Sequence, residues 1–169
     1  MKLIILNGSS GVGKSTVAER LHLQMPSSVL IDIDELRRTI PNYREKREES
    51  LRLAYEYADN AIEDGLKAGS DVIIDKAILQ PEVLDTFVAL AHKYDAKVVE
   101  FLLFAEKENV QKRAEDRGFK AGGMLTPEKV VELWEKADAF RRQRTDAIII
   151  DTTHISPEEV FSMVSKRVE

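Results

Sequence analysis

The stretch GSSGVGKST, Gly8–Thr16, decides the fold predicted for this chain. It satisfies the pattern G-x-x-x-x-G-K-[ST]. The mostly apolar run Lys2–Leu6 precedes it, and Val17, Leu21 and Met25 follow at helical spacing. A strand, a glycine-rich turn and a helix are therefore expected in this order, which is the context in which the pattern forms a phosphate-binding loop.

In such a loop, successive backbone N–H groups and the helix N-terminus surround a phosphate, and the glycines allow this close approach. Lys14 is expected to reach the β- and γ-phosphate oxygens of ATP and to act in catalysis, and the Ser15 hydroxyl is expected to ligate Mg²⁺. The predicted nucleotide contacts are Gly8, Ser9, Ser10, Gly11, Val12, Gly13, Lys14, Ser15 and Thr16. An ordinary Gly/Ser turn is the alternative, and the flanking periodicity disfavours it.

Strand and helix patterns alternate along the rest of the chain. Further strands are expected at 29–33, 71–75, 97–104 and 147–150, and helices at 34–40, 43–68, 81–94, 106–117 and 127–144, with a last helix capped by Ser156. Short apolar strands separated by helices predict an α/β fold whose parallel sheet is covered on both faces. Ligands of such folds bind at the C-terminal ends of the strands, so candidate site residues are sought there.

Composition sets the class of protein. The chain has 169 residues, of which 43% are apolar and 33% charged, so we expect one globular domain spanning residues 1–169. MKLIILNG has too short an apolar run for a signal peptide, and no later run is long enough to span a membrane, which makes the cytoplasm the expected location.

Cysteine and charge content exclude or disfavour other chemistry. The sequence has no cysteine, which rules out disulfides, thiolate nucleophiles and cysteine zinc sites, so a bound metal would have oxygen ligands. The formal charge of −5 gives no global attraction for nucleic acid, which is a possible partner but not the favoured one. A GTPase is disfavoured because neither a D-x-x-G nor an N-K-x-D motif is present.

Two aspartates stand where the second expected strand becomes a helix. Asp32 and Asp34 alternate with isoleucines, so both carboxylates are expected on one face of the strand. Asp34 could accept the proton of an acceptor hydroxyl as a general base, or it could cap the following helix. Asp32 is a candidate for contacting the substrate. Arg37 and Arg38 follow within a turn, where they could bind an anionic substrate group or be solvated.

The third expected strand ends in VIID. Asp75 at its end is predicted to hold Mg²⁺ through water. Lys76 comes next, and it could pair with Asp75, touch the substrate or be solvated.

Arginines precede a second glycine-rich stretch. Arg113 and Arg117 are four residues apart on one expected helix face, and Gly118, Gly122 and Gly123 follow. We expect a lid at about 113–127 that brings arginine to the transferring phosphoryl group and excludes water. Ion pairs with nearby carboxylates are the alternative role of these arginines.

Other residues carry weaker signals. Arg141, Arg142 and Arg144 gather near an expected helix C-terminus, where the helix dipole alone favours cations. The three histidines have no metal-like spacing and are expected to be structural. Tyr55 and Trp134 fit a helix core or a pocket wall equally well.

Five segments together resemble small P-loop kinases and cover most of the chain. They are MKLIILNGSSGVGKST, IDIDELRRTIP, VIID, the R-x-x-x-R of Arg113 and Arg117, and IIIDTTHISPEEV. The first two look like chloramphenicol phosphotransferase, in which the residue matching Asp34 would be the base. The D-x-D-x-x-R of the second also looks like adenylylsulfate kinases and the kinase module of polynucleotide kinases.

The resemblance implies a P-loop NTPase three-layer α/β/α sandwich with a five-stranded parallel sheet in the order 2-3-1-4-5 and a helical lid. It also implies that Arg113 lies on or near adenine, that Arg117 is the catalytic lid arginine, and that Thr152 borders the adenine.

Three functional classes follow. The first is an ATP- and Mg²⁺-dependent kinase acting on a hydroxyl of a small molecule, the second a 5′-hydroxyl polynucleotide or nucleotide kinase, and the third a non-catalytic ATP-binding regulator. No pattern in the sequence indicates an oligomeric state.

Overall fold

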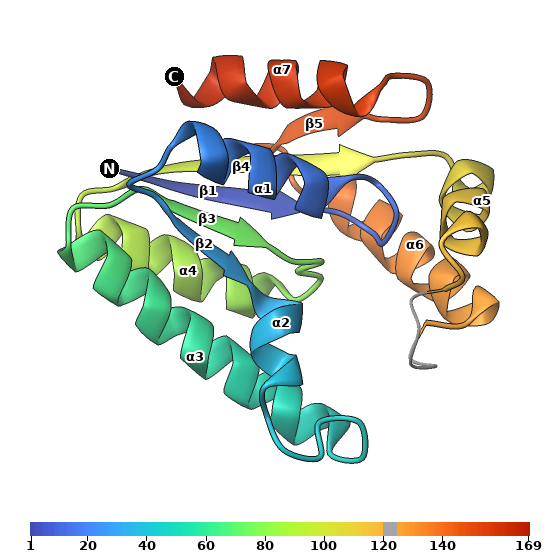
Figure 1. Cartoon of the computed structure of the whole chain (residues 1–169), viewed down its shortest axis with the longest axis horizontal. Coiled ribbons are helices and arrows are strands. Elements are labelled where there is room, and N and C mark those ends of the chain that lie inside the picture. The colour runs from blue at the N-terminus through green and yellow to red at the C-terminus, as the bar shows by residue number, and fades with distance from the viewer. Residues whose placement is uncertain (120–124) are drawn as a thin grey trace.

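The computed structural model describes residues 1–119 and 125–169, and strands alternate with helices along the chain (Figure 1). The strands are β1 Lys2–Asn7, β2 Val29–Asp32, β3 Val72–Asp75, β4 Lys97–Phe104 and β5 Ile148–Asp151. The helices are α1 Lys14–Gln24, α2 Ile33–Arg38, α3 Arg47–Lys67, α4 Pro81–Lys93, α5 Lys107–Asp116, α6 Pro127–Arg141 and α7 Pro157–Val168.

The strands form one parallel sheet in the order β2-β3-β1-β4-β5, which confirms the predicted fold class and strand order. The registers place Asp75 of β3 beside Leu6 of β1 on one side and beside Asp32 of β2 on the other. The ends of these three strands are therefore level. The loops that follow them lie at a common edge of the sheet.

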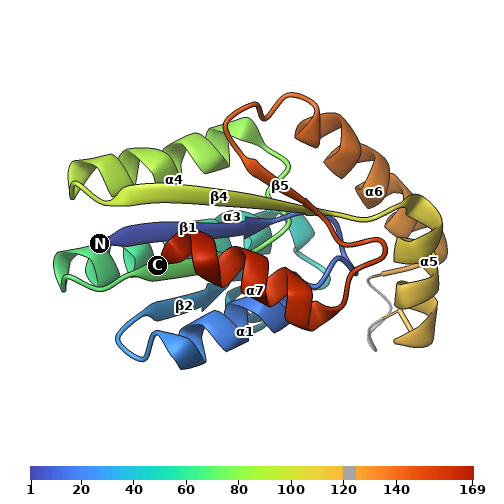
Figure 2. The same cartoon turned by 90° about the horizontal axis from the view of Figure 1, so that it is seen from above.

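Helices cover both faces of the sheet (Figures 1 and 2). Strand residues alternate between two cores: Leu3 and Ile5 pack on the side of α3 and α4, whereas Ile4 and Leu6 pack on the side of α1 and α7. All four are fully buried, because a central parallel strand has no solvent-exposed face. α5 and α6 lie beyond the C-terminal ends of the strands (Figure 1).

The junction after β2 differs from the expectation. The strand ends at Asp32, not Ile33, because the Asp32 carboxylate accepts hydrogen bonds from the backbone N–H groups of Asp34, at 2.8 Å, and Glu35, at 3.1 Å. Asp32 is thus the N-cap of α2. Capping of this helix by Asp34, which was the alternative to its role as a base, is wrong. The prediction that both aspartates share one strand face is also wrong, because Asp34 lies in α2.

Other boundaries differ by a few residues. α2 ends at Arg38, and α3 begins at Arg47 instead of residue 43, after a turn in which Asn42 has a φ of 57°. At the other end of the chain, Ser156 and Glu159 form the reciprocal hydrogen bonds of a capping box at α7, as predicted for Ser156. Gly122 and Gly123 of the predicted lid lie outside the described residues.

In the described ranges 1–119 and 125–169, no helix combines the length and the apolar character that crossing a membrane requires.

Candidate functional site

The phosphate-binding loop connects β1 to α1 through three glycines in the left-handed region. The φ values of Gly8, Gly11 and Gly13 are 132°, 88° and 97°. At Gly8 a Cβ would also lie 2.1 Å from the Leu103 carbonyl oxygen, so no other residue fits there. Gly13 occupies the N-cap of α1 without a side-chain cap, which directs the helix N-terminus toward the loop.

Asn7 anchors the start of this loop, and the sequence analysis missed it. Its Oδ1 accepts from the backbone N–H groups of Gly8, at 2.7 Å, and Ile78, at 2.9 Å, and its Nδ2 donates to the Ile78 carbonyl at 2.9 Å. The side chain is buried. It therefore joins the phosphate loop to the segment after β3. An amide ending an apolar strand beside the first loop glycine was the available signal.

Lys14, Ser15 and Asp75 meet at the start of α1. Lys14 is buried and its Nζ donates to the Ser9 carbonyl at 2.9 Å, so it lies along the loop. The Ser15 hydroxyl lies close enough to the Asp75 carboxylate to lower the pKa of that carboxylate. The two residues predicted to hold Mg²⁺ are thus adjacent.

Burial raises the pKa of Asp75 above its usual 3.8, and the charges of Asp32 and Asp34 add to the rise. The Lys14 ammonium and the Ser15 hydroxyl oppose it. A buried carboxylate that is costly to ionise gains from a nearby cation.

These residues fit Mg²⁺ bound together with nucleotide phosphates. The ion usually takes one or two protein oxygens and completes its shell with phosphate and water, and a serine hydroxyl beside a carboxylate supplies such oxygens. Across the described parts of the chain, no group of three or more His, Asp or Glu side chains could hold a metal alone.

Asp34 and Lys76 form an ion pair at this edge of the sheet. The Lys76 Nζ lies 2.5 Å from Asp34 Oδ1, and the Lys76 side chain is only 11% exposed. Lys76 is therefore neither solvated nor paired with Asp75, two of the three roles considered for it.

Arg37 and Arg38 have partners within the protein. Arg37 donates to the Ser50 hydroxyl at 3.0 Å and to the Arg47 carbonyl at 2.7 Å, and so connects α2 to α3. Arg38 pairs with Glu35 on the exposed side of α2. A substrate contact of Arg37 or Arg38 stays a prediction.

Tyr55 of α3 lies close to Asp34 and Arg37. Burial, followed by the negative charge of Asp34, raises the pKa of Tyr55 to about 12, while Arg37 opposes the rise. The phenol therefore stays protonated at neutral pH, and its hydroxyl donates to Gln80 Oε1 at 3.5 Å.

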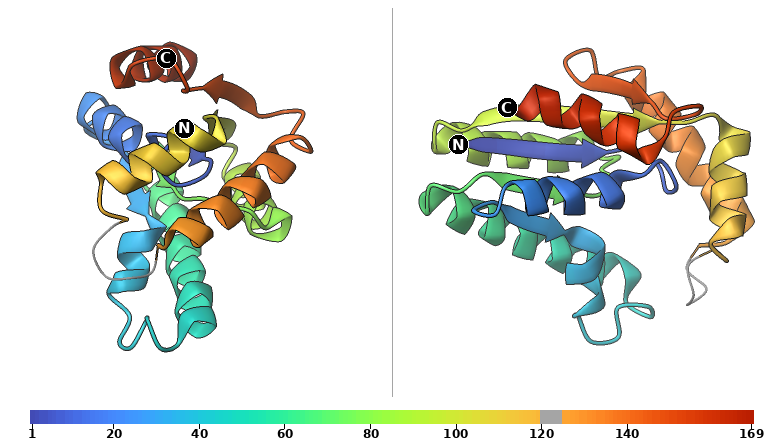
Figure 3. Two further views of the ribbon diagram at one scale, coloured as in Figure 1. Left: turned by 90° about the vertical axis from the view of Figure 1, so that its right-hand side faces the viewer. Right: turned by 45° about the horizontal axis from the view of Figure 1, so that its top comes forward.

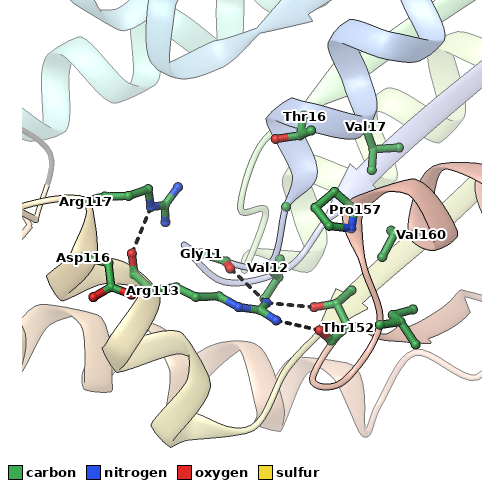
Figure 4. Close-up of a pocket in the computed structure, with 12 residues that line it drawn as sticks. Gly11, Val12, Thr16, Val17, Arg113, Asp116, Arg117, Thr152, Pro157 and Val160 are labelled. Atoms are coloured by element: carbon green, nitrogen blue, oxygen red, sulfur yellow. Dashed lines mark hydrogen bonds between the residues drawn. The ribbon is translucent and has the colours of Figure 1, made fainter.

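A cavity of about 350 Å³ opens beside the phosphate loop (Figure 4). It is lined by Gly11, Val12, Gly13, Thr16, Val17, Arg113, Asp116, Arg117, Thr152, Ile155, Pro157 and Val160. The lining comes from the loop, α1, α5, and α7 with the segment before it. Its mainly apolar walls with a few polar groups suit an aromatic base.

Arg113 crosses this cavity and holds its walls together. Its guanidinium donates to the Gly11 carbonyl at 3.3 Å and to the Thr152 carbonyl at 2.7 Å (Figure 4). Arg117 donates from Nε to the Arg113 carbonyl at 3.1 Å. Within the described residues neither arginine pairs with a carboxylate, so the alternative of helix-face ion pairs is wrong for this part of the chain.

The weaker candidates have structural contacts. Arg141 and Arg142 pair with Asp138, and Arg144 pairs with the buried Glu100. Trp134 donates from Nε1 to the Ala105 carbonyl at 2.8 Å and packs at 5.9 Å from the Phe104 ring. None of these residues lines the cavity described above.

The family model described as an AAA domain matches residues 3–137, which include the phosphate loop, Asp34, Asp75 and both cavity arginines. The chain belongs to this AAA-domain family. No curated protein matches the chain in sequence.

Solved structures similar to this AAA-domain chain share its P-loop kinase-like fold. A gluconokinase from Sinorhizobium meliloti superimposes with a TM-score of 0.68 at 18% identity, covering 96% of this chain and 89% of the other. The tunicamycin resistance protein of Deinococcus radiodurans gives 0.65 at 20% identity, covering 99% of this chain and 96% of the other. A chain of the Pnkp1/Rnl/Hen1 RNA repair complex gives 0.68 at 21% identity, covering 84% of this chain but 45% of the other.

Proposed function

We propose that this protein is an ATP-dependent phosphotransferase that moves the γ-phosphoryl group to a hydroxyl of a small molecule. One observation carries the proposal: the phosphate loop, with Lys14 and Ser15, stands beside strands whose ends bring Asp75 and Asp34 to the same edge. A loop that holds phosphates next to a carboxylate able to accept a proton is the arrangement phosphoryl transfer needs.

In the proposed reaction the acceptor oxygen attacks the γ-phosphorus, and the bond from that phosphorus to the β–γ bridging oxygen breaks, so that ADP leaves. The proton of the acceptor hydroxyl goes to the Asp34 carboxylate. Lys14 and the loop N–H groups bind the phosphates, and Arg117 neutralises charge as the group moves. Mg²⁺, held by Ser15 and Asp75, would supply charge neutralisation at the phosphate oxygens.

The cavity beside Arg113 is proposed as the adenine site. Gly11, Val12 and Gly13 of the phosphate loop line it and Asp34 does not, so a nucleotide would extend from the cavity along the loop toward the acceptor. The neighbours in fold include a gluconokinase and a chain of an RNA repair complex, which is consistent with an acceptor hydroxyl on a small molecule or on a polynucleotide. The net charge of −5 favours the small molecule.

The test uses ATP labelled in the γ position, Mg²⁺, and a panel of sugars, nucleosides, aminoglycosides, other alcohols and 5′-hydroxyl oligonucleotides. We expect label in one small-molecule class, and no transfer by Lys14→Ala, because the loop then lacks its mobile cation. Transfer to oligonucleotides alone would establish the polynucleotide kinase alternative. ATP binding in calorimetry without transfer to any acceptor would mean that the chain is a nucleotide-binding regulator.

The role of Asp34 is tested with the acceptor found in that panel. Asp34→Asn removes the proton acceptor but not the cap of α2, which Asp32 provides. Loss of the charge opposite Lys76 should lower the melting temperature, but the amide oxygen can still accept from the ammonium, so the protein should fold and bind ATP. Transfer should fall about 10²- to 10⁴-fold. The exposed Asp85→Asn serves as the control. Normal turnover by Asp34→Asn would show that another group takes the proton.

A further inference from the structure

Lys76 has a contact that its place in the sequence does not suggest. It directly follows β3, next to Asp75, yet its ammonium reaches Asp34 on α2, 42 positions away in sequence. The Lys76 side chain is 11% exposed and that of Asp34 is 49% exposed. The lysine is thus largely covered by protein, while the carboxylate it holds keeps an open side.

The burial of Lys76 makes this contact one-sided in its energetics. An ammonium removed from water is costly unless a hydrogen-bonding partner of opposite charge compensates it. Because about half of the Asp34 side chain is exposed, its charge loses less hydration free energy than the charge of Lys76 does. We therefore expect the buried lysine to fix the position of the Asp34 carboxylate, and not the carboxylate to fix the position of the lysine.

Asp34 needs such a constraint because of the element that carries it. α2 has only six residues and follows β2, an edge strand of the sheet. A helix this short has little stability of its own and takes its position from contacts with the rest of the protein. β3 lies between β2 and β1 and is buried along its whole length, so a side chain anchored at its end starts from a rigid point.

Charge at the edge of the sheet gives a second reason for the pair. Asp32, Asp34 and Asp75 are close enough that the charges of the first two raise the pKa of the third. Two lysines face these three carboxylates: Lys14, which acts on Asp75, and Lys76, which contacts Asp34. The Lys76 ammonium therefore offsets part of the repulsion between Asp34 and its acidic neighbours.

We propose that Lys76 is a positioning residue, which acts on phosphoryl transfer through Asp34 by holding its carboxylate toward the phosphate loop. The inference rests on the proposed function. It assigns Lys76 a role distinct from binding the acceptor, and it makes the Lys76–Asp34 pair, rather than Asp34 alone, the unit that prepares the acceptor hydroxyl.

The first experiment compares Lys76→Met with Lys76→Arg, using the acceptor that the panel identifies. Lys76→Met keeps the length of the side chain without its charge and should lower kcat about 10-fold or more, with the KM values for ATP and acceptor changed less than 3-fold. Lys76→Arg should restore most of the rate. The matched control is Lys93→Met. It removes another lysine–carboxylate pair, the one that the exposed Lys93 of α4 forms with Glu63 of α3 at 2.7 Å.

A double-mutant cycle separates action through Asp34 from direct contact. In an Asp34→Asn background, Lys76→Met should lower kcat by less than 2-fold, because the group it positions is already gone. A further loss equal to that in the wild type would overturn the proposal, as would a rise in acceptor KM with kcat unchanged, which would assign Lys76 to acceptor binding.

Failure of the proposed function is recognised separately, because the wild-type protein would then phosphorylate no member of the panel. Failure of this inference alone would leave wild-type transfer and its loss in Asp34→Asn intact, with Lys76→Met as active as Lys93→Met. Thermal melts of each variant show that it is folded, and Lys76→Arg provides a charged variant if Lys76→Met is not.

Discussion

Arg117 and Gly11 meet where α5 faces the phosphate loop. The Arg117 Nη2 would lie 3.3 Å from a Cβ placed on Gly11, and its Nε is held by the Arg113 carbonyl at 3.1 Å. The two arginines thus have different tasks. Arg113 binds carbonyl groups of the cavity wall, whereas Arg117 points its guanidinium at the loop (Figure 4).

Removal of Arg117 should therefore affect catalysis more than binding. We expect Arg117→Ala to lower kcat by a factor on the order of 10² to 10⁴ with the fold intact, if its charge acts on the transferring group. Steady-state kinetics with varied ATP measures this, with Lys112→Ala on the exposed side of α5 as the control. A change confined to the KM for ATP would assign Arg117 to ground-state binding.

At the scale of elements, α2 is the part of the fold on which the proposed chemistry depends most. It carries Asp34 and Arg37, and the polar contacts that hold it include the Asp32 cap, the bonds from Arg37 to Ser50 and Arg47, and the Lys76 pair. α2 and the N-terminal part of α3 extend on one side of the strand ends, opposite α5 and α6 (Figure 3). The acceptor is expected between these groups of helices.

The cap of α2 can be tested by itself. Asp32→Ala removes both cap hydrogen bonds and should cost about 1 kcal/mol of unfolding free energy, whereas Asp32→Asn keeps a cap and should cost less. Transfer should fall further in the alanine variant, because α2 carries the proposed base. Urea denaturation and kinetics of both variants provide the comparison. Equal stability of the two would show that the cap does not stabilise α2.

For the whole molecule, we expect the charge of Asp75 to lower the free energy of unfolding, because this side chain is buried at the end of β3. Its pKa is raised in the folded protein, so the native state holds this proton more tightly than the unfolded chain does. Stability from this residue is fully present below its unfolded value near 3.8 and is lost as the pH rises through the raised folded pKa. At neutral pH the ionised carboxylate therefore destabilises the nucleotide-free fold.

Asp75→Asn should consequently melt at a higher temperature than the wild type at pH 7, and the difference should shrink as the pH falls toward 4. The same variant should lose stabilisation by Mg²⁺ with ATP, since it lacks the carboxylate. Thermal melts across this pH range, with and without Mg²⁺ and ATP, measure both effects, and the exposed Asp85→Asn should show neither. A variant that melts below the wild type at pH 7 would contradict the argument.

Much of the fold could be predicted because its signals are local. The glycines of the loop, the apolar runs of the strands and the Ser156 cap each act within a few residues, and steric limits and hydrogen bonding translate them directly into structure. The class of fold and the glycine-rich loop between the first strand and the first helix therefore follow from the amino-acid sequence by itself, and they carry the prediction of a ligand site at the strand ends.

Only the tertiary structure decided which groups these side chains contact. Asp32, not Asp34, caps α2, because two backbone N–H groups point toward the Asp32 carboxylate. Two aspartates so close in sequence have the same capping ability, so residue type alone does not distinguish them. Lys76 reaches Asp34, and Arg113 reaches Thr152, across 42 and 39 positions of sequence. Such contacts depend on strand order and on the register of neighbouring strands, which bring distant segments together after each has formed its own structure.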